Sequence, residues 1–190
     1  MKPMYIIAAA LAATSLWALA ENATGTLPST WMLAGESPAA YQAGIDYTET
    51  SSGKGAKFLR HVAGDGKSWG SLTQQIGADN YRGRRVRFQA KVKSRDVDGW
   101  AGLWMRADSQ STQGAAFYNS QDKPIKGSVA WQTRSVVLDV PADAESMLFG
   151  VINSGSGEVW MDELSLEVVG DDVAVDRMPP RAPLAQRPSL

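Results

Sequence analysis

The clearest structural signal in the chain is Arg85-Val86-Arg87-Phe88-Gln89-Ala90-Lys91-Val92-Lys93, in which polar and apolar side chains alternate. A period of two places each set on its own face of a β-strand, whereas a helix would spread both sets around its circumference. The pattern predicts a strand within residues 83–94 that has one buried face and one solvent-exposed, basic face.

A second predicted strand, residues 99–107, follows a short polar connection. Leu103 and Met105 alternate with Trp104 and Arg106, so the two pairs point to opposite faces. The first pair suits a core. The second places a flat aromatic ring beside a cation with five donors, a combination suited to binding a polar, planar molecule.

Bulk composition limits the possible classes of protein. The chain has 190 residues, of which 44% are hydrophobic and 21% charged, with a formal net charge of −1 and no cysteine. These values are typical of a globular protein without disulfides, whose stability comes from an apolar core. No basic excess indicates a nucleic-acid partner.

The two ends of the chain differ from the middle. Residues 1–20 have the layout of a signal peptide, with a cation at Lys2, an apolar run and small residues before the cleavage site. The run is short for a membrane span, so we expect cleavage, no later membrane contact, and a bacterial periplasmic or secreted protein; an uncleaved anchor is the alternative. We interpret residues 21–29 as a polar lead-in, 30–169 as one β-sandwich domain and 170–190 as a disordered tail rich in Pro and Arg.

The middle of the chain consists of short alternating segments between turns rich in glycine, with no helical period. This predicts an all-β fold, an antiparallel β-sandwich of jelly-roll type, with a closed up-and-down barrel as the alternative. In the last segment we expect Trp160 and Leu164 to share one face. The remaining predicted strands are residues 30–33, 44–48, 56–62, 69–76, 115–119, 131–140, 146–152 and 158–169.

Several short motifs recur at a recognisable spacing: Gly102-Leu103-Trp104-Met105-Arg106, Phe117-Tyr118-Asn119, Lys123-Pro124-Ile125-Lys126-Gly127, Trp131, Val137-Leu138-Asp139-Val140-Pro141, Phe149-Gly150 and Gly157-Glu158-Val159-Trp160-Met161-Asp162. Together they resemble a bacterial β-sandwich domain that also occurs joined to AraC-type transcription activators. More loosely, the chain is similar to the galactose-binding-like jelly rolls, the fold of many carbohydrate-binding modules. The resemblance implies this fold; a DNA-binding role is not carried over, because the chain has a leader and no helix-turn-helix segment.

The candidate ligand-binding residues combine aromatic rings with hydrogen-bonding groups, as a sugar site requires. We expect Trp104 and Arg106 to form the floor of such a site and Tyr118, Asn119 and Trp131 its walls, with Trp100 beside them. Tryptophan in a β-sandwich often serves the core instead, and this is our interpretation of Trp31, Trp69 and Trp160. The predicted function is therefore recognition of a carbohydrate or a similar small polar ligand on one sheet face.

Catalysis has weaker support in the sequence. Residues 66–70 match the G-x-S-x-G pattern, but the expected helix and the downstream histidine are missing, and His61 is the only histidine. Glu158 and Asp162 share a strand face about 13 Å apart, too far for glycoside hydrolysis. We therefore predict a non-catalytic binding module; the alternatives are a structural or envelope-associated interaction protein and a glycoside hydrolase.

Metal binding depends on the resemblance. No cluster of His or Cys indicates zinc or copper. Sugar-binding jelly rolls hold a structural calcium with an acid of the final strand, which implies calcium at Asp162 with Asp46 as a partner. The alternative is that Asp162 accepts hydrogen bonds from a turn. We expect no other cofactor.

Overall fold

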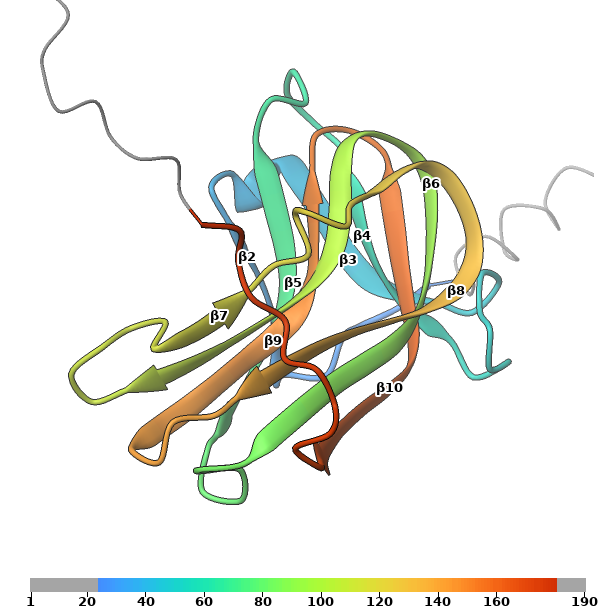
Figure 1. Cartoon of the computed structure of the whole chain (residues 1–190). Coiled ribbons are helices and arrows are strands. Elements are labelled where there is room, and N and C mark those ends of the chain that lie inside the picture. Colours follow the sequence, from blue (N-terminus) through green and yellow to red (C-terminus); the bar gives the residue numbers. More distant parts are fainter. Residues whose placement is uncertain (1–23, 181–190) are drawn as a thin grey trace, which may run out of the picture.

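A computed structural model describes residues 24–180, which form antiparallel strands and one short 3-10 turn, Pro38–Ala40 (Figure 1). The all-β prediction is confirmed, and most predicted strands lie within a few residues of the observed ones. The strands are β1 Thr24–Gly25, β2 Trp31–Gly35, β3 Tyr41–Asp46, β4 Ala56–His61, β5 Trp69–Gly77, β6 Arg85–Ser109, β7 Ala116–Tyr118, β8 Ile125–Asp139, β9 Ala144–Ser154 and β10 Glu158–Val169.

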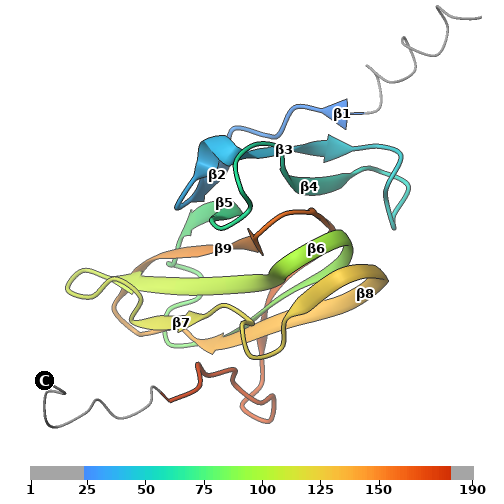
Figure 2. The same cartoon turned by 90° about the horizontal axis from the view of Figure 1, so that it is seen from above.

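Strand β6 connects the two layers of the molecule (Figures 1 and 2). Its first half, up to Arg95, pairs with β10 and β8, and its second half, from Trp100, pairs with β9 and β7, while β8 follows it across the bend as far as Ala101. The chain bends between them at Asp96, whose φ of 53° is rare outside glycine. The first layer is therefore β1-β3-β4-β10-β6-β8 and the second is β2-β5-β9-β6-β7. The sequence predicted two separate strands here because the polar connection resembles a turn.

The sheet path is open, since its terminal strands β1 and β2 are not paired with each other in the part of the chain that the structure describes. This favours the sandwich over the barrel alternative. The core lies between the layers, where Phe88 of the first contacts Phe149 of the second with ring centroids 4.9 Å apart.

A bulge in β10 corrects one predicted face. Asp162 pairs with Lys91 but Ser165 pairs with Gln89, so β10 carries one extra residue, and Glu163 there has a φ of 50°. One extra residue reverses the side to which the following side chains point. Trp160 therefore packs on the outer face of the first layer, whereas Leu164 packs against the core between the layers.

The beginning of the predicted disordered tail is ordered. The backbone N–H of Asp176 donates to the carbonyl of Val137, and its carboxylate accepts from Val137 N (3.0 Å) and Lys123 Nζ (2.9 Å). Met178 packs against the core. Residues 170–180 thus lie along β8, because Asp176 pairs with the backbone N–H and carbonyl of Val137 at the outer edge of that strand. The predicted leader, 1–20, and residues 181–190 lie outside the described residues, and β1 falls within the predicted lead-in.

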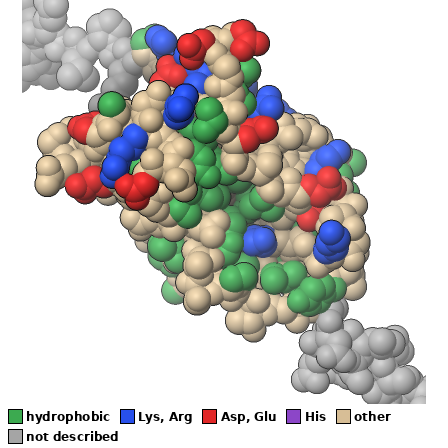
Figure 3. All heavy atoms as spheres, turned by 90° about the horizontal axis from the view of Figure 1, so that it is seen from below, with side chains coloured by type: hydrophobic (Ala, Val, Ile, Leu, Met, Phe, Trp, Pro, Cys, Tyr) green, Lys and Arg blue, Asp and Glu red, His purple; other side chains and the backbone are tan. Residues whose placement is uncertain are grey.

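Seen from below, hydrophobic side chains form a strip across the molecule between charged ones (Figure 3). Trp69 and Phe117 are among the large hydrophobic residues that stay exposed, each at 38%. Such exposed rings are candidates for ligand contacts when they gather around a hollow. Among the described residues, no helix has the length and apolar character needed to cross a membrane.

Candidate functional site

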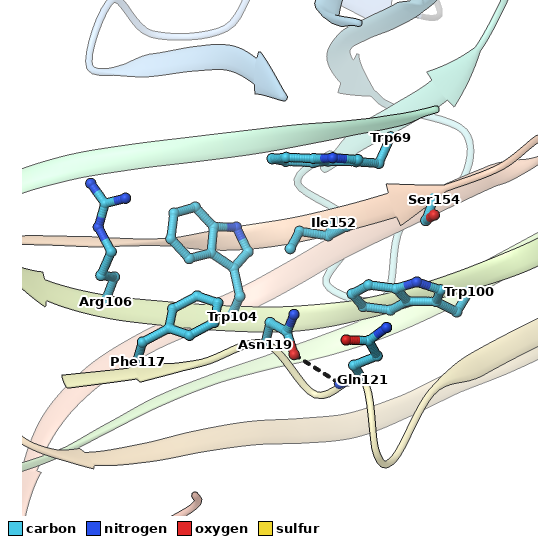
Figure 4. Close-up of a pocket in the computed structure, with 9 residues that line it drawn as sticks. All are labelled: Trp69, Trp100, Trp104, Arg106, Phe117, Asn119, Gln121, Ile152 and Ser154. Carbon is cyan, nitrogen blue, oxygen red and sulfur yellow. Dashed lines mark hydrogen bonds between the residues drawn. The ribbon is translucent and has the colours of Figure 1, made fainter. Parts of the chain in front are cut away.

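The register of three strands builds a pocket on the outer face of the second layer. Trp100 of β6 and Trp69 of β5 both pair with Ser154 of β9, one from each side. One rung further, Ile152 pairs with Gly102. Figure 4 shows the rings of Trp69 and Trp100 on either side of Ile152. Two tryptophans about 30 residues apart in sequence therefore face one hollow.

Trp104 forms the floor, as the alternation along β6 predicts. Its indole N–H donates to the hydroxyl of Ser71 (2.8 Å), which shares a further hydrogen bond with Thr73. Trp104 pairs with Gly150 of β9, and its indole reaches past that strand to Ser71 of β5. The residue is 8% exposed, so its ring is fixed in place while still lining the pocket.

Arg106 closes one end of the pocket (Figure 4). Its Nη2 donates to Asp108 Oδ2 (2.8 Å), and Asp108 Oδ1 accepts from the backbone N–H of Gly114 (2.7 Å). The Nε of Arg106 is buried and has no partner among residues 24–180. The ion pair therefore sets the direction of the guanidinium, whose fork carries more donors than Asp108 uses.

The loop between β7 and β8 supplies the polar side of the pocket. Asn119 Oδ1 accepts from the backbone N–H of Gln121 (3.1 Å), and Ser120, with a φ of 59°, donates from its hydroxyl to the carbonyl of Leu103 (2.7 Å). These bonds hold the loop against β6. The side chains of Asn119 and Gln121 consequently bring two amides to the edge of the aromatic floor (Figure 4).

The complete pocket has a volume of about 510 Å³, within the range of roughly 300–1,000 Å³ typical of small-molecule sites. It offers aromatic surface, two amides, one hydroxyl and one guanidinium, and no carboxylate. It is lined by Trp69, Trp100, Trp104, Arg106, Phe117, Asn119, Gln121, Ile152 and Ser154.

Four of the six predicted ligand residues meet in this pocket, and two do not. Tyr118 is 1% exposed and points into the core, because Phe117 beside it takes the outward position on β7. Its hydroxyl donates to Asp122 (2.6 Å), and burial together with that carboxylate raises the pKa of Tyr118. Trp131 lies on the other layer, against Phe58 and Trp160. Neither is a wall of the pocket.

Sequence reasoning missed Trp69, which it assigned to the core, and four other lining residues. Along β5, Leu72 packs inward while Trp69 and Ser71 turn outward, so parity within the strand could have placed Trp69 correctly. The other four are Phe117, Gln121, Ile152 and Ser154. Phe117 lies in the motif Phe117-Tyr118-Asn119, of which the prediction used only Tyr118 and Asn119, and the remaining three carry no motif.

The two acids of the implied calcium site hold a loop. Asp46 accepts from the backbone of Thr48 and Glu49 and from the indole of Trp160 (3.0 Å). Burial alone would raise the pKa of Asp46, but these bonds outweigh it and lower the pKa. Within residues 24–180 no three side chains of His, Cys, Asp or Glu form a metal-binding group. Calcium binding stays a prediction.

Asp162 holds the same loop from the other side. Its carboxylate accepts from the backbone N–H groups of Ser51 and Ser52 and from the hydroxyl of Thr50, each at 2.8 Å. Burial opposes ionisation, but these bonds and that of Glu163 N lower the pKa of Asp162 below its ordinary value. Oxygen atoms surrounded by donors are already satisfied, which fits the turn-binding alternative.

Comparison with known proteins supports this fold assignment. No protein-family model matches the chain. A stretch of 144 residues, 75% of the chain, is 36% identical to an uncharacterised HTH-type transcriptional regulator, YbfP, of Bacillus subtilis (strain 168), and covers 49% of it. The chain thus spans about half the length of the curated relative it matches, which fits the resemblance to a domain joined to transcription activators.

Solved structures of similar fold include carbohydrate-binding modules. The CBM22-1 and GH10 modules of Clostridium thermocellum xylanase 10B, complexed with xylohexaose, match with a TM-score of 0.58 and 12% identity over 81% of this chain and 29% of that one. The CBM22-1 xylan-binding domain of Paenibacillus barcinonensis Xyn10C matches at 0.52, with 12% identity over 76% and 88%. The enzymatically active domain of bacteriophage CBA120 tailspike protein 4 matches at 0.54, with 16% identity over 74% and 20%. The fold is the β-sandwich jelly roll of these modules.

Proposed function

We propose that this chain is a non-catalytic module that binds a carbohydrate on the outer face of its second layer. The observation that carries the proposal is the pocket in which Trp69, Trp100 and Trp104 surround a hollow edged by the amides of Asn119 and Gln121. Aromatic rings contact the apolar faces of a sugar, while amides and a guanidinium reach its hydroxyl groups. Similar folds in xylan-binding proteins support the choice of ligand class.

The lining speaks against the hydrolase alternative. Glycoside hydrolysis uses two carboxyl groups on either side of the scissile bond. None of the nine lining residues is an acid, and the nearby Asp108 is held by Arg106 and by Gly114 N. The pocket can therefore hold a sugar but lacks the acid pair that would cleave it.

The proposal includes export, which depends on the leader predicted at residues 1–20. In the alternative of a structural or envelope-associated protein, the tail 170–190 would tether the protein. Residues 170–180 instead pack on β8 through Asp176 and Met178, which favours a role in completing the sandwich.

Binding to soluble polysaccharides, measured by affinity electrophoresis and calorimetry, tests the proposal, with xylan as the first ligand. Trp69→Ala should weaken binding by about tenfold, since one exposed stacking ring contributes about 1–1.5 kcal/mol. Trp131→Ala is the matched control, because Trp131 is also a partly exposed outer-face tryptophan but belongs to the other layer. Absence of binding to every glycan, or equal loss in both variants, would refute the proposal.

A further inference from the structure

A second opening lies between the two layers, away from the aromatic pocket. Strand β4 begins at Ala56, and its last pair with β10 joins Lys57 to Met161. Beyond Met161, strand β10 therefore pairs only with β6. The bulge at Glu163 then turns Leu164 and Leu166 toward the interior. With no further strand beside it, a hollow of about 250 Å³ opens here above the edge of the core.

The inner surface of this opening is apolar. Phe88 and Phe149 form its base with ring centroids 4.9 Å apart, and Trp31 meets Phe149 edge to face at 6.3 Å. Leu164 and Leu166 lie along one side. Such a surface favours a flat or aliphatic hydrocarbon group and would leave the hydroxyl groups of a sugar unpaired.

One lysine side chain, that of Lys57, lies beside these apolar residues. Lys57 lies two residues before the core residue Leu59 on β4, so its side chain points inward, and its Nζ lies 5.1 Å from the centroid of the Trp31 ring. It makes no hydrogen bond or ion pair with any residue between 24 and 180. Burial lowers the pKa of Lys57, and the charge of Asp162 partly opposes this. An ammonium group without a direct ion pair here would gain from an incoming anion.

We propose that this opening binds a small amphipathic carboxylate, whose charged group meets Lys57 Nζ and whose apolar body lies against Trp31, Leu164 and Leu166. A single cation suits a monovalent carboxylate, whereas a phosphate group normally needs several donors. The amide of Gln74 and the hydroxyl of Ser165 at the rim offer further hydrogen bonds to the carboxylate. The site uses no residue of the aromatic pocket and is independent of sugar binding.

The test is calorimetric titration of the full chain with cinnamate and with cinnamyl alcohol, which has the same body without the charge. We expect saturable cinnamate binding with a Kd below about 1 mM and alcohol binding at least about tenfold weaker. Lys57→Met keeps the length of the side chain and should weaken cinnamate binding by about tenfold or more. Lys91→Met, which removes a lysine from the outer face of the same layer, should leave it unchanged.

Two further variants make the result unambiguous. Leu164→Trp fills the hollow without touching the cation and should abolish binding of both compounds, so it carries the test if Lys57→Met fails to fold. Trp69→Ala should bind cinnamate normally. Absence of saturable binding, equal affinity for the alcohol, an unchanged Kd in Lys57→Met, or loss of binding in Trp69→Ala would each overturn the proposal.

Discussion

The two outer faces of the sandwich share strand β6, yet the tryptophan at the centre of each face has different surroundings. On the first layer, Trp160 is completely buried although it points away from the core. Lys93 and Arg95 lie against its ring, at 5.7 and 4.9 Å from the ring centroid, and its indole N–H donates to Asp46. This tryptophan is sealed by long side chains from the neighbouring strand.

On the second layer, the corresponding neighbours are missing. Trp104 pairs with Gly150, and Gly102, two residues before Trp104 on the same face, has no side chain either. The Trp104 ring is only 8% exposed, but it lines the hollow that Trp69 and Trp100 flank. The residue opposite the tryptophan therefore differs between the two faces: Lys93 lies against the ring of Trp160, whereas Gly150 has no side chain to place over that of Trp104.

The largest expected effect separates the two faces by stability. Trp160→Ala should lower the free energy of unfolding by about 3–5 kcal/mol, because it empties a filled site and leaves Asp46 without one donor. Trp100→Ala should lower it by less than about 1 kcal/mol, since that ring is only partly buried. Denaturant unfolding measures both. Equal losses of unfolding free energy would contradict the distinction between a structural tryptophan on the first layer and a binding tryptophan on the second.

The next effect concerns the loop that the first face holds. Asp162→Asn should cost about 2 kcal/mol at pH 7, because the amide offers a donor to the N–H groups of Ser51 and Ser52. The lowered pKa of Asp162 makes its contribution complete above the unfolded value of about 3.9 and lost as the pH falls through the folded value. The stability gap between wild type and variant should therefore narrow below about pH 4 in thermal unfolding. A gap independent of pH would contradict the ionised role.

Some parts of the fold could be predicted from the sequence and others could not. Strict alternation, as in Val86, Phe88 and Ala90, predicts strands because the pleat has a fixed period. The bulge at Glu163 could not be predicted, since a non-glycine residue with positive φ carries no sequence signal. Everything after it on β10 changed faces, which is why Trp160 and Leu164 were wrongly placed together.

The residues of the candidate site likewise include some that the sequence predicts and some that it does not. Trp100, Trp104 and Arg106 could be predicted because one strand presents them on one face. Trp69 and Ile152 come from β5 and β9, and only the cross-strand register brings them there. Tyr118 was wrong by a single position of parity, because in a three-residue strand no alternation is long enough to fix which face is buried.

A smaller effect tests the sealing of Trp160 directly. Lys93→Ala removes one side chain from its ring and the ion pair with Glu49, and we expect a loss of about 1 kcal/mol in unfolding free energy. More telling is fluorescence quenching by acrylamide in a variant background where every tryptophan except Trp160 is replaced by phenylalanine. The quenching should increase as Trp160 becomes accessible. Unchanged quenching would mean that the rest of the first face seals the ring without Lys93.

The smallest effect comes from the ion pairs that give the first face its charge. Arg87 and Glu167 face each other on β6 and β10 with a third or more of each side chain exposed, so water and salt screen their attraction. Arg87→Gln should change the unfolding free energy by less than about 0.5 kcal/mol and leave glycan binding intact. Arg106→Gln, whose ion pair with Asp108 lies at the aromatic pocket and is less exposed, should instead weaken glycan binding several-fold in calorimetry. If Arg87→Gln reduced glycan affinity as much as Arg106→Gln, the ligand would lie on the first face, because only there does Arg87 reach the surface.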